Sequence, residues 1–154
     1  MSFGALSPNA VRALNAGAKK GGFAHDTGEG GVSPYHRENG GDIIWEIGSG
    51  YFGCRHRDGS FDPEEFARIA SDDQIKMVEL KVSQGAKPGH GGVLPAAKVT
   101  TEIAETRGVP MGADCISPAR HGRARPTATT APCTRWRGSC CTAASLRSRR
   151  AGSS

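Results

Sequence analysis

Hydrophobic positions follow two alternating patterns over residues 1–121. Short apolar runs that are typical of strands occupy residues 2–6, 42–48, 77–83 and 111–117. Between them, apolar residues spaced three and four positions apart predict helices over residues 8–20, 61–73 and 98–108. Strands that alternate with helices predict an α/β fold, in which a parallel sheet is connected by helical crossovers.

The first predicted helix has clear start and stop signals. Ser7 stands at the N-cap position before a proline, and the glycine pair at 21–22 follows the last turn. Within the helix, the spacing of Val11, Leu14 and Ala18 predicts one buried face.

Two glycine-rich segments, 25–31 and 84–92, lie at or just past the ends of expected strands. In α/β proteins this is the side of the sheet where ligands bind. Glycine lets the main chain approach a ligand closely and offer its N–H groups. The ionisable side chains in these segments are those of His25, Glu29, Lys87 and His90. A glycine-rich loop with a lone lysine suggests an anionic ligand.

Common nucleotide, metal and hydrolase signatures are missing. Residues 17–22 have the Gly-x4-Gly spacing of a phosphate loop, but Phe23 stands where that motif requires lysine. The sequence has no strand–GxGxxG–helix unit and no CxxC or GxSxG motif. Its histidines are scattered, which disfavours a metal site. It also has no apolar stretch of membrane-spanning length and no secretory signal, so we expect a cytoplasmic protein.

The composition changes abruptly at residue 122. Residues 1–121 carry 13 basic and 15 acidic side chains, whereas residues 122–154 carry seven arginines, no acid and a single leucine. So few apolar side chains predict an unstructured basic tail. A frameshifted reading of the gene is the favoured interpretation of this tail. A nucleic-acid-binding arm and an inert linker are the alternatives.

Three ordered motifs resemble the FMN-binding synthase domain of glutamate synthase. They are MSFGALS at 1–7, the Thr-Gly-Glu-Gly-Gly core at 27–31, and LKVSQGAKPGHGGVLPAAKV at 80–99. An Ile-x-x-x-Arg helix and a Ser-Pro pair follow the third motif. The likeness covers residues 1–121. It is closer to the stand-alone glutamate-synthase-like proteins, because of His90 and the ending SPARH.

This resemblance implies a (β/α)8 TIM barrel that binds FMN at the carboxyl ends of its strands. In such an enzyme, ammonia adds to 2-oxoglutarate, and reduced flavin delivers hydride to the resulting 2-iminoglutarate to give L-glutamate. The resemblance assigns Lys87 and Glu29 to catalysis and Gln84 and Lys87 to substrate binding. It assigns Gly4, Ala5, Leu6, Ser7 and Lys81 to the flavin.

Each assignment has a structural alternative. Lys87 is otherwise a solvated loop lysine, and Glu29 a carboxylate that binds loop amides. Lys81 is otherwise the ion-pair partner of a barrel carboxylate such as Glu79 or Asp114.

A TIM barrel takes about 250 residues, so residues 1–121 correspond to about half a barrel, with loss at both ends. We therefore expect a chain that retains no FMN by itself and self-associates through open sheet edges. Iron–sulfur ligands and a glutaminase domain are absent from this sequence, and the electron donor is open. The alternative functions are a truncated, non-catalytic remnant and, less favoured, a nucleic-acid-binding module.

Overall fold

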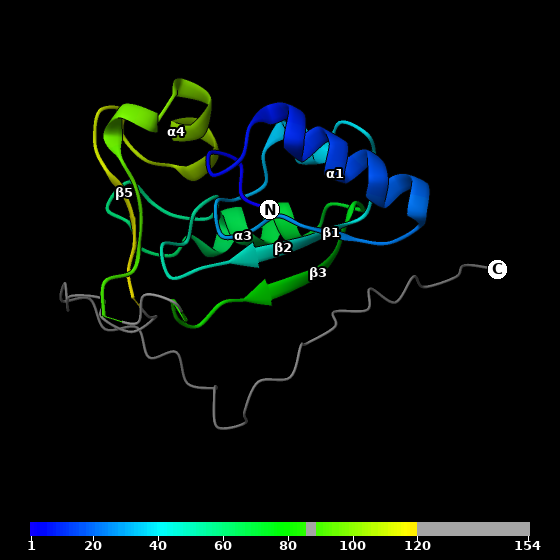
Figure 1. The fold of residues 1–154 in the computed structure, drawn as a ribbon. Coiled ribbons are helices and arrows are strands. Elements are labelled where there is room, and N and C mark those ends of the chain that lie inside the picture. The colour runs from blue at the N-terminus through cyan, green and yellow to red at the C-terminus, as the bar shows by residue number, and fades with distance from the viewer. Residues whose placement is uncertain (86–88, 120–154) are drawn as a thin grey trace.

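The computed structural model describes residues 1–85 and 89–119, and a three-stranded parallel sheet lies at its centre (Figure 1). The strands are β1 (His25–Asp26), β2 (Ile43–Ile47) and β3 (Ile75–Leu80), paired in that order. Helix α2 (Pro34–Arg37) connects β1 to β2, and helix α3 (Pro63–Ala70) connects β2 to β3. The predicted parallel sheet with helical crossovers is therefore confirmed. Lys87 and the basic tail lie outside the described residues.

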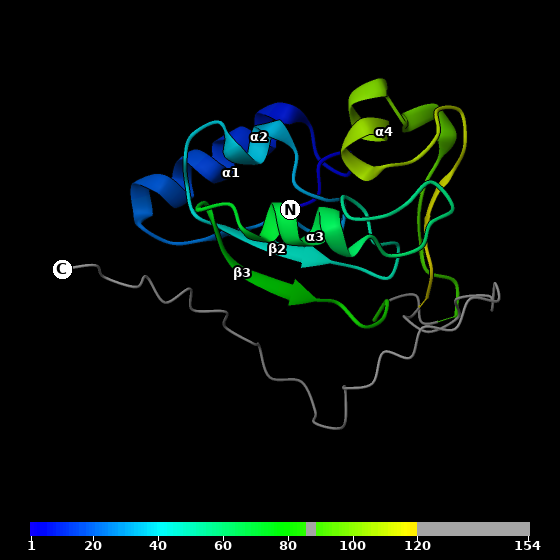
Figure 2. The ribbon, with the colours of Figure 1, turned by 180° about the vertical axis from the view of Figure 1, so that it is seen from behind.

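Helix α1 (Pro8–Gly21) begins at the predicted proline and ends at the first glycine of the predicted stop pair. The Ser7 side chain accepts a hydrogen bond from the N–H of Ala10 at 3.3 Å. Gly22 closes the helix in the left-handed conformation, at φ +66°, and donates its N–H to the carbonyl of Ala18. Views from both sides show α1 and α2 side by side (Figures 1 and 2).

The buried face of α1 differs from the predicted one at one position. Val11 and Ala18 are buried as expected, but Leu14 is 41% exposed and the neighbouring Asn15 is fully buried. The Asn15 amide exchanges two hydrogen bonds of 3.2 Å with the main chain of Gly41. The prediction was wrong at Leu14 because a buried amide satisfied by main-chain groups leaves no hydrophobic signal.

The core has two parts. Between the sheet and α3, the rings of Trp45 and Phe66 stack with centroids 5.6 Å apart. The second part packs helix α4 (Thr101–Arg107) and α1 against the N-terminal segment. Its buried members are Phe3, Val11, Phe52, Val99, Ile103, Ala104 and Cys115.

The predicted strand over residues 2–6 was wrong. This segment forms a turn in which Phe3 and Leu6 make only an isolated bridge. Gly4 adopts φ +99°, and the N–H of Leu6 donates to the carbonyl of Ser2 at 3.1 Å. A left-handed residue in the middle of a short segment reverses the chain, so the extended conformation cannot continue.

The predicted closing strand over residues 111–117 was wrong in length and in position. Gly112, at φ +77°, lies in a turn, and only β5 (Cys115–Ser117) is extended. β5 pairs antiparallel with β4 (Gly92–Leu94) and forms a two-stranded ribbon apart from the parallel sheet. A 3-10 turn at Ala96–Lys98 leads from β4 towards α4. Within the described residues, no helix is long and apolar enough to cross a membrane.

Candidate functional site

A pocket of about 360 Å³ lies where the loops after the parallel strands meet the β4–β5 ribbon. The arrowheads of β2 and β3 point toward this end of the molecule (Figure 1). Glu29 follows β1, and Lys81 and Gln84 follow β3, so these lining residues come from carboxyl ends of parallel strands. Ala5 and Arg107 also line the pocket. The pocket therefore lies where ligands of α/β sheets bind.

Glu29 is the centre of a polar network in this pocket. Its Oε2 accepts a hydrogen bond from Nε2 of Gln84 at 2.6 Å and lies 3.3 Å from Nζ of Lys81. The main-chain N–H of Gln84 donates to the carbonyl of Ala119 at 2.8 Å, which fixes the amide beside the carboxylate. The network thus unites three residues that the resemblance assigned to the site.

Two glycines allow the close approach of Glu29 to the main chain. A Cβ atom at Gly48 would lie 2.6 Å from Oε2 and 2.7 Å from Cβ of Glu29. A Cβ atom at Gly92 would lie 3.2 Å from the other carboxylate oxygen. Glu29 is therefore packed against the segment after β2 and against β4, and the side of the pocket next to it has little free space.

Arg107 is a lining residue that the sequence interpretation did not assign. It is only 6% exposed, and its guanidinium donates to Oγ of Ser2 and to the carbonyl of Phe3, both at 3.0 Å. The guanidinium also lies 3.4 Å from the Cys115 sulfur and 5.4 Å from the centroid of the Phe52 ring. Within residues 1–85 and 89–119, no carboxylate lies within 4 Å of it, and its Nε has no hydrogen-bond partner.

The spacing of residues on α4 identifies Arg107 as an inward-facing side chain. Ile103 and Arg107 are four residues apart on α4, so they share a face of the helix. Because Ile103 is buried in the core, the arginine that follows it is directed inward as well. Cβ atoms at Gly4 and Gly30 would each lie 3.1 Å from Nη2 of Arg107, so both glycines make room for the guanidinium.

Of the four N-terminal residues assigned to the flavin, only Ala5 lines the pocket. The N–H groups of Gly4 and Leu6 are engaged within the turn. The Ser7 hydroxyl caps α1. These residues therefore shape the entrance to α1, and Ala5 is the one that reaches the pocket.

The other sequence candidates lie elsewhere. His25 is buried in β1, with its ring centroid 5.5 Å from that of His36, and burial lowers its pKa. His90 is exposed and is not a lining residue. Asp114, one of the suggested partners of Lys81, instead accepts a hydrogen bond from the N–H of Ala96 at 2.8 Å.

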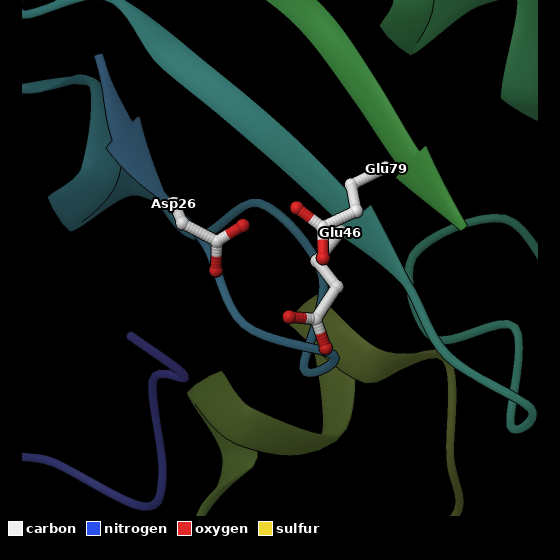
Figure 3. Close-up of side chains that lie close together, drawn as sticks. All are labelled: Asp26, Glu46 and Glu79. Carbon is white, nitrogen blue, oxygen red and sulfur yellow. The ribbon is translucent and has the colours of Figure 1, made fainter. Parts of the chain in front are cut away.

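Three carboxylates meet on one face of the parallel sheet, one from each strand (Figure 3). Oxygens of Asp26, Glu46 and Glu79 lie within 4.8 Å of one another. Burial, and next to it the Asp26 carboxylate, raises the pKa of Glu46. Lys81 lies 3.9 Å from Glu46, so it connects this acidic trio to Glu29 in the pocket. The trio depends on strand register, which residue spacing along the chain does not reveal.

Comparison with known proteins identifies the family. The family model described as the conserved region in glutamate synthase matches residues 1–127. The glutamate synthase large subunit-like protein YerD of Bacillus subtilis is 50% identical over 121 residues, which are 78% of this chain and 23% of YerD.

Two further relatives are similar over the same part of the chain. The archaeal-type glutamate synthase [NADPH] of Thermotoga maritima is 40% identical over 79% of this chain and 21% of its own length. The archaeal glutamate synthase [NADPH] of Archaeoglobus fulgidus is 42% identical over 77% of this chain and 21% of its own length. This chain thus spans less than a quarter of these relatives. It belongs to the glutamate synthase family.

Proposed function

We propose that this chain forms the oxo-acid-binding part of a glutamate-synthase-type oxidoreductase. The reaction is the FMN-mediated reductive amination of 2-oxoglutarate, through 2-iminoglutarate, to L-glutamate. Family membership supports the reaction class, and the α/β arrangement of β1–β3 is compatible with part of a (β/α)8 barrel. The observation that carries the proposal is the buried Arg107 guanidinium, which faces the pocket without a carboxylate partner among the described residues.

Substrate binding follows from the charges of the pocket. Nη2 of Arg107 donates to Ser2 and Phe3, so its permanent positive charge and the donors of Nη1 take one carboxylate of 2-oxoglutarate. The family resemblance assigns Lys87 to the developing negative charge on the oxo oxygen. A volume of about 360 Å³ lies within the usual range for small-molecule sites and suits a short dicarboxylic acid.

Proton transfer is the task of Glu29. Its carboxylate takes a proton from ammonium, and the neutral ammonia attacks the carbonyl carbon of the oxo acid. The same carboxyl group returns the proton when the hydroxyl leaves as water and the carbon–nitrogen double bond forms. Gln84 orients the carboxylate through the 2.6 Å hydrogen bond, and Lys81 compensates its charge at 3.3 Å.

The described residues fit the ring edge of a flavin better than its phosphate. Ala5 brings main chain to the pocket wall, and Lys81 provides a cation there. When bound, reduced FMN supplies the hydride for the imine carbon. Ala5 and Lys81 are the residues of this chain that would contact it.

Calorimetric titration of the 154-residue chain with 2-oxoglutarate tests the proposal. We expect Arg107→Lys to weaken binding by at least about tenfold, because a lysine ammonium cannot contact Ser2 and Phe3 and also present a donor to the carboxylate. Arg68→Lys is the control, since Arg68 is exposed on α3 and lies outside this pocket. Equal affinity of the Arg107→Lys variant and the parent would contradict the proposed site. A parent that does not bind 2-oxoglutarate would favour the non-catalytic remnant.

A further inference from the structure

Glu46 is not a lining residue of the pocket, yet it lies next to the pocket's lysine. Its Oε1 is 3.9 Å from Nζ of Lys81, and its side chain is 15% exposed. The main-chain N–H of Lys81 donates to the carbonyl of Ile47 at 3.0 Å, so the pairing of β2 with the chain of β3 extends to this residue. Lys81 therefore has a fixed main chain, and its ammonium lies between Glu29 in the pocket and Glu46 on the sheet.

We propose that Glu46 is a positioning residue that holds the Lys81 ammonium beside Glu29, and that Asp26 and Glu79 make this hold sensitive to pH. The role of Glu46 in catalysis rests on the proposed function. The contact between Glu46 and Lys81 is independent of it.

The register of the sheet explains the sensitivity to pH. Glu46 and Glu79 are direct partners across β2 and β3, and Asp26 on β1 completes the acidic trio (Figure 3). Like charges placed opposite each other in a sheet are destabilising. Protonation of Glu46 relieves this repulsion, but it also removes the negative charge that attracts Lys81.

The ionisable groups that act on Glu46 come from every neighbouring element. They are the amino group of Met1, Asp26 on β1, Glu29 after β1, Glu79 on β3 and Lys81 after β3. Burial and the three neighbouring carboxylates raise the pKa of Glu46 above its usual 4.5, while Lys81 opposes them. Lys81 is thus released from Glu46, as pH falls, at a higher pH than an ordinary glutamate would give.

Nuclear magnetic resonance of side chains tests this inference without any ligand. The ¹³C shift of Lys81 Cε is followed against pH in the parent chain, in Glu46→Gln, and in Glu79→Gln as the matched control. We expect the parent to show an acid step in the Lys81 signal. We expect Glu46→Gln to reduce this step without abolishing it, because Glu29 still lies 3.3 Å from Lys81 in that variant. In Glu79→Gln the step remains but moves to lower pH by roughly half a unit, because one like charge is gone.

Glu46→Asp is the control for a structural effect of Glu46→Gln. Glu46→Asp keeps the charge on a shorter side chain, and we expect it to restore the acid step. A step of the same size and midpoint in Glu46→Gln as in the parent, or no step in the parent, would overturn the inference. If instead the parent shows the step but does not bind 2-oxoglutarate, only the proposed function fails.

Discussion

His36 shows how a single buried side chain is satisfied in its neutral form. The N–H of Ser33 donates to Nδ1 at 3.0 Å, so the ring proton resides on Nε2, which lies 2.8 Å from the carbonyl of Met1. The residue is fully buried. Its pKa is lowered from 6.5 to about 4. Burial is the largest cause, the hydrogen bond to the Met1 carbonyl opposes it, and the nearby His25 contributes to the lowering.

The free energy of unfolding should therefore fall in mild acid. The unfolded chain binds a proton on this histidine near pH 6.5, whereas the native chain does so only near pH 4, so stability is present above pH 6.5 and is lost between these values. The loss amounts to roughly 3 kcal/mol for a shift of this size. Urea unfolding between pH 4 and 7.5 measures it.

The control for this prediction is a second histidine. His36→Asn keeps an acceptor near the position of Nδ1 and removes the titration, so we expect a flatter pH profile than that of the parent. His90 is exposed, and His90→Asn should leave the profile unchanged. If the parent and His36→Asn lose the same stability in acid, the assignment to His36 is refuted.

At the scale of elements, α1 is attached to the sheet by an amide as well as by apolar contacts. Asn15 satisfies both main-chain groups of Gly41, which lies two residues before β2. A Cβ atom at Gly41 would lie 2.5 Å from the Asn15 carbonyl oxygen, so the loop passes directly against the helix. This contact fixes the helix relative to the chain that enters β2.

Asn15→Ala should destabilise the fold by about 1–3 kcal/mol, because it leaves the buried N–H of Gly41 without a partner. The Gly41 carbonyl keeps the hydrogen bond from Nε2 of Gln74 at 2.7 Å. Leu14→Ala is the matched control on the same helix. Leu14 is 41% exposed, so its truncation should change the free energy of unfolding by less than about 1 kcal/mol. Chemical denaturation of both variants measures the difference. If Leu14→Ala lowers the free energy of unfolding more than Asn15→Ala does, the buried face predicted from the sequence is correct and the one described here is wrong.

The elements that the sequence predicted well are those with local signals. Ser7 and Gly22 mark the ends of α1, and Asp62 accepts N–H groups at the start of α3. β1 has two residues and α2 four, too few for either hydrophobic period to appear. The β4–β5 ribbon depends on contacts between distant segments, as does the turn at Gly4. Local patterns do not contain this information.

At the scale of the whole molecule, the site also consists of residues that local motifs predicted and residues that only the fold brings together. The motifs identified Glu29, Gln84, Lys81 and Ala5, which the fold brings into one pocket. Arg107 was quoted only as part of a motif, since an arginine in the last turn of a helix is usually solvated. The acidic trio was missed because its members meet only through strand register. The sequence thus indicated which residues belong to the site, but it did not indicate which side chains contact each other.

We expect the purified chain to hold no stoichiometric FMN. It spans less than a quarter of its relatives, and phosphate in such barrels is often bound by loops after the last strands. Within the described residues, β1 and β3 each have a strand neighbour on one side only. A visible absorbance spectrum measures bound flavin, with YerD of Bacillus subtilis purified in parallel as the comparison. One flavin per chain would show the expectation to be wrong.

Because residue 48 is a glycine, a substitution at this position can change the size of the pocket. Glu29 lies against Gly48 so closely that one added methyl group would displace the carboxylate toward the cavity. Alanine there would thus narrow the cavity while the chemical identity of every lining group stays the same. Size selectivity among oxo acids, from short to long, can then be separated from charge recognition by altering a residue that carries no functional group.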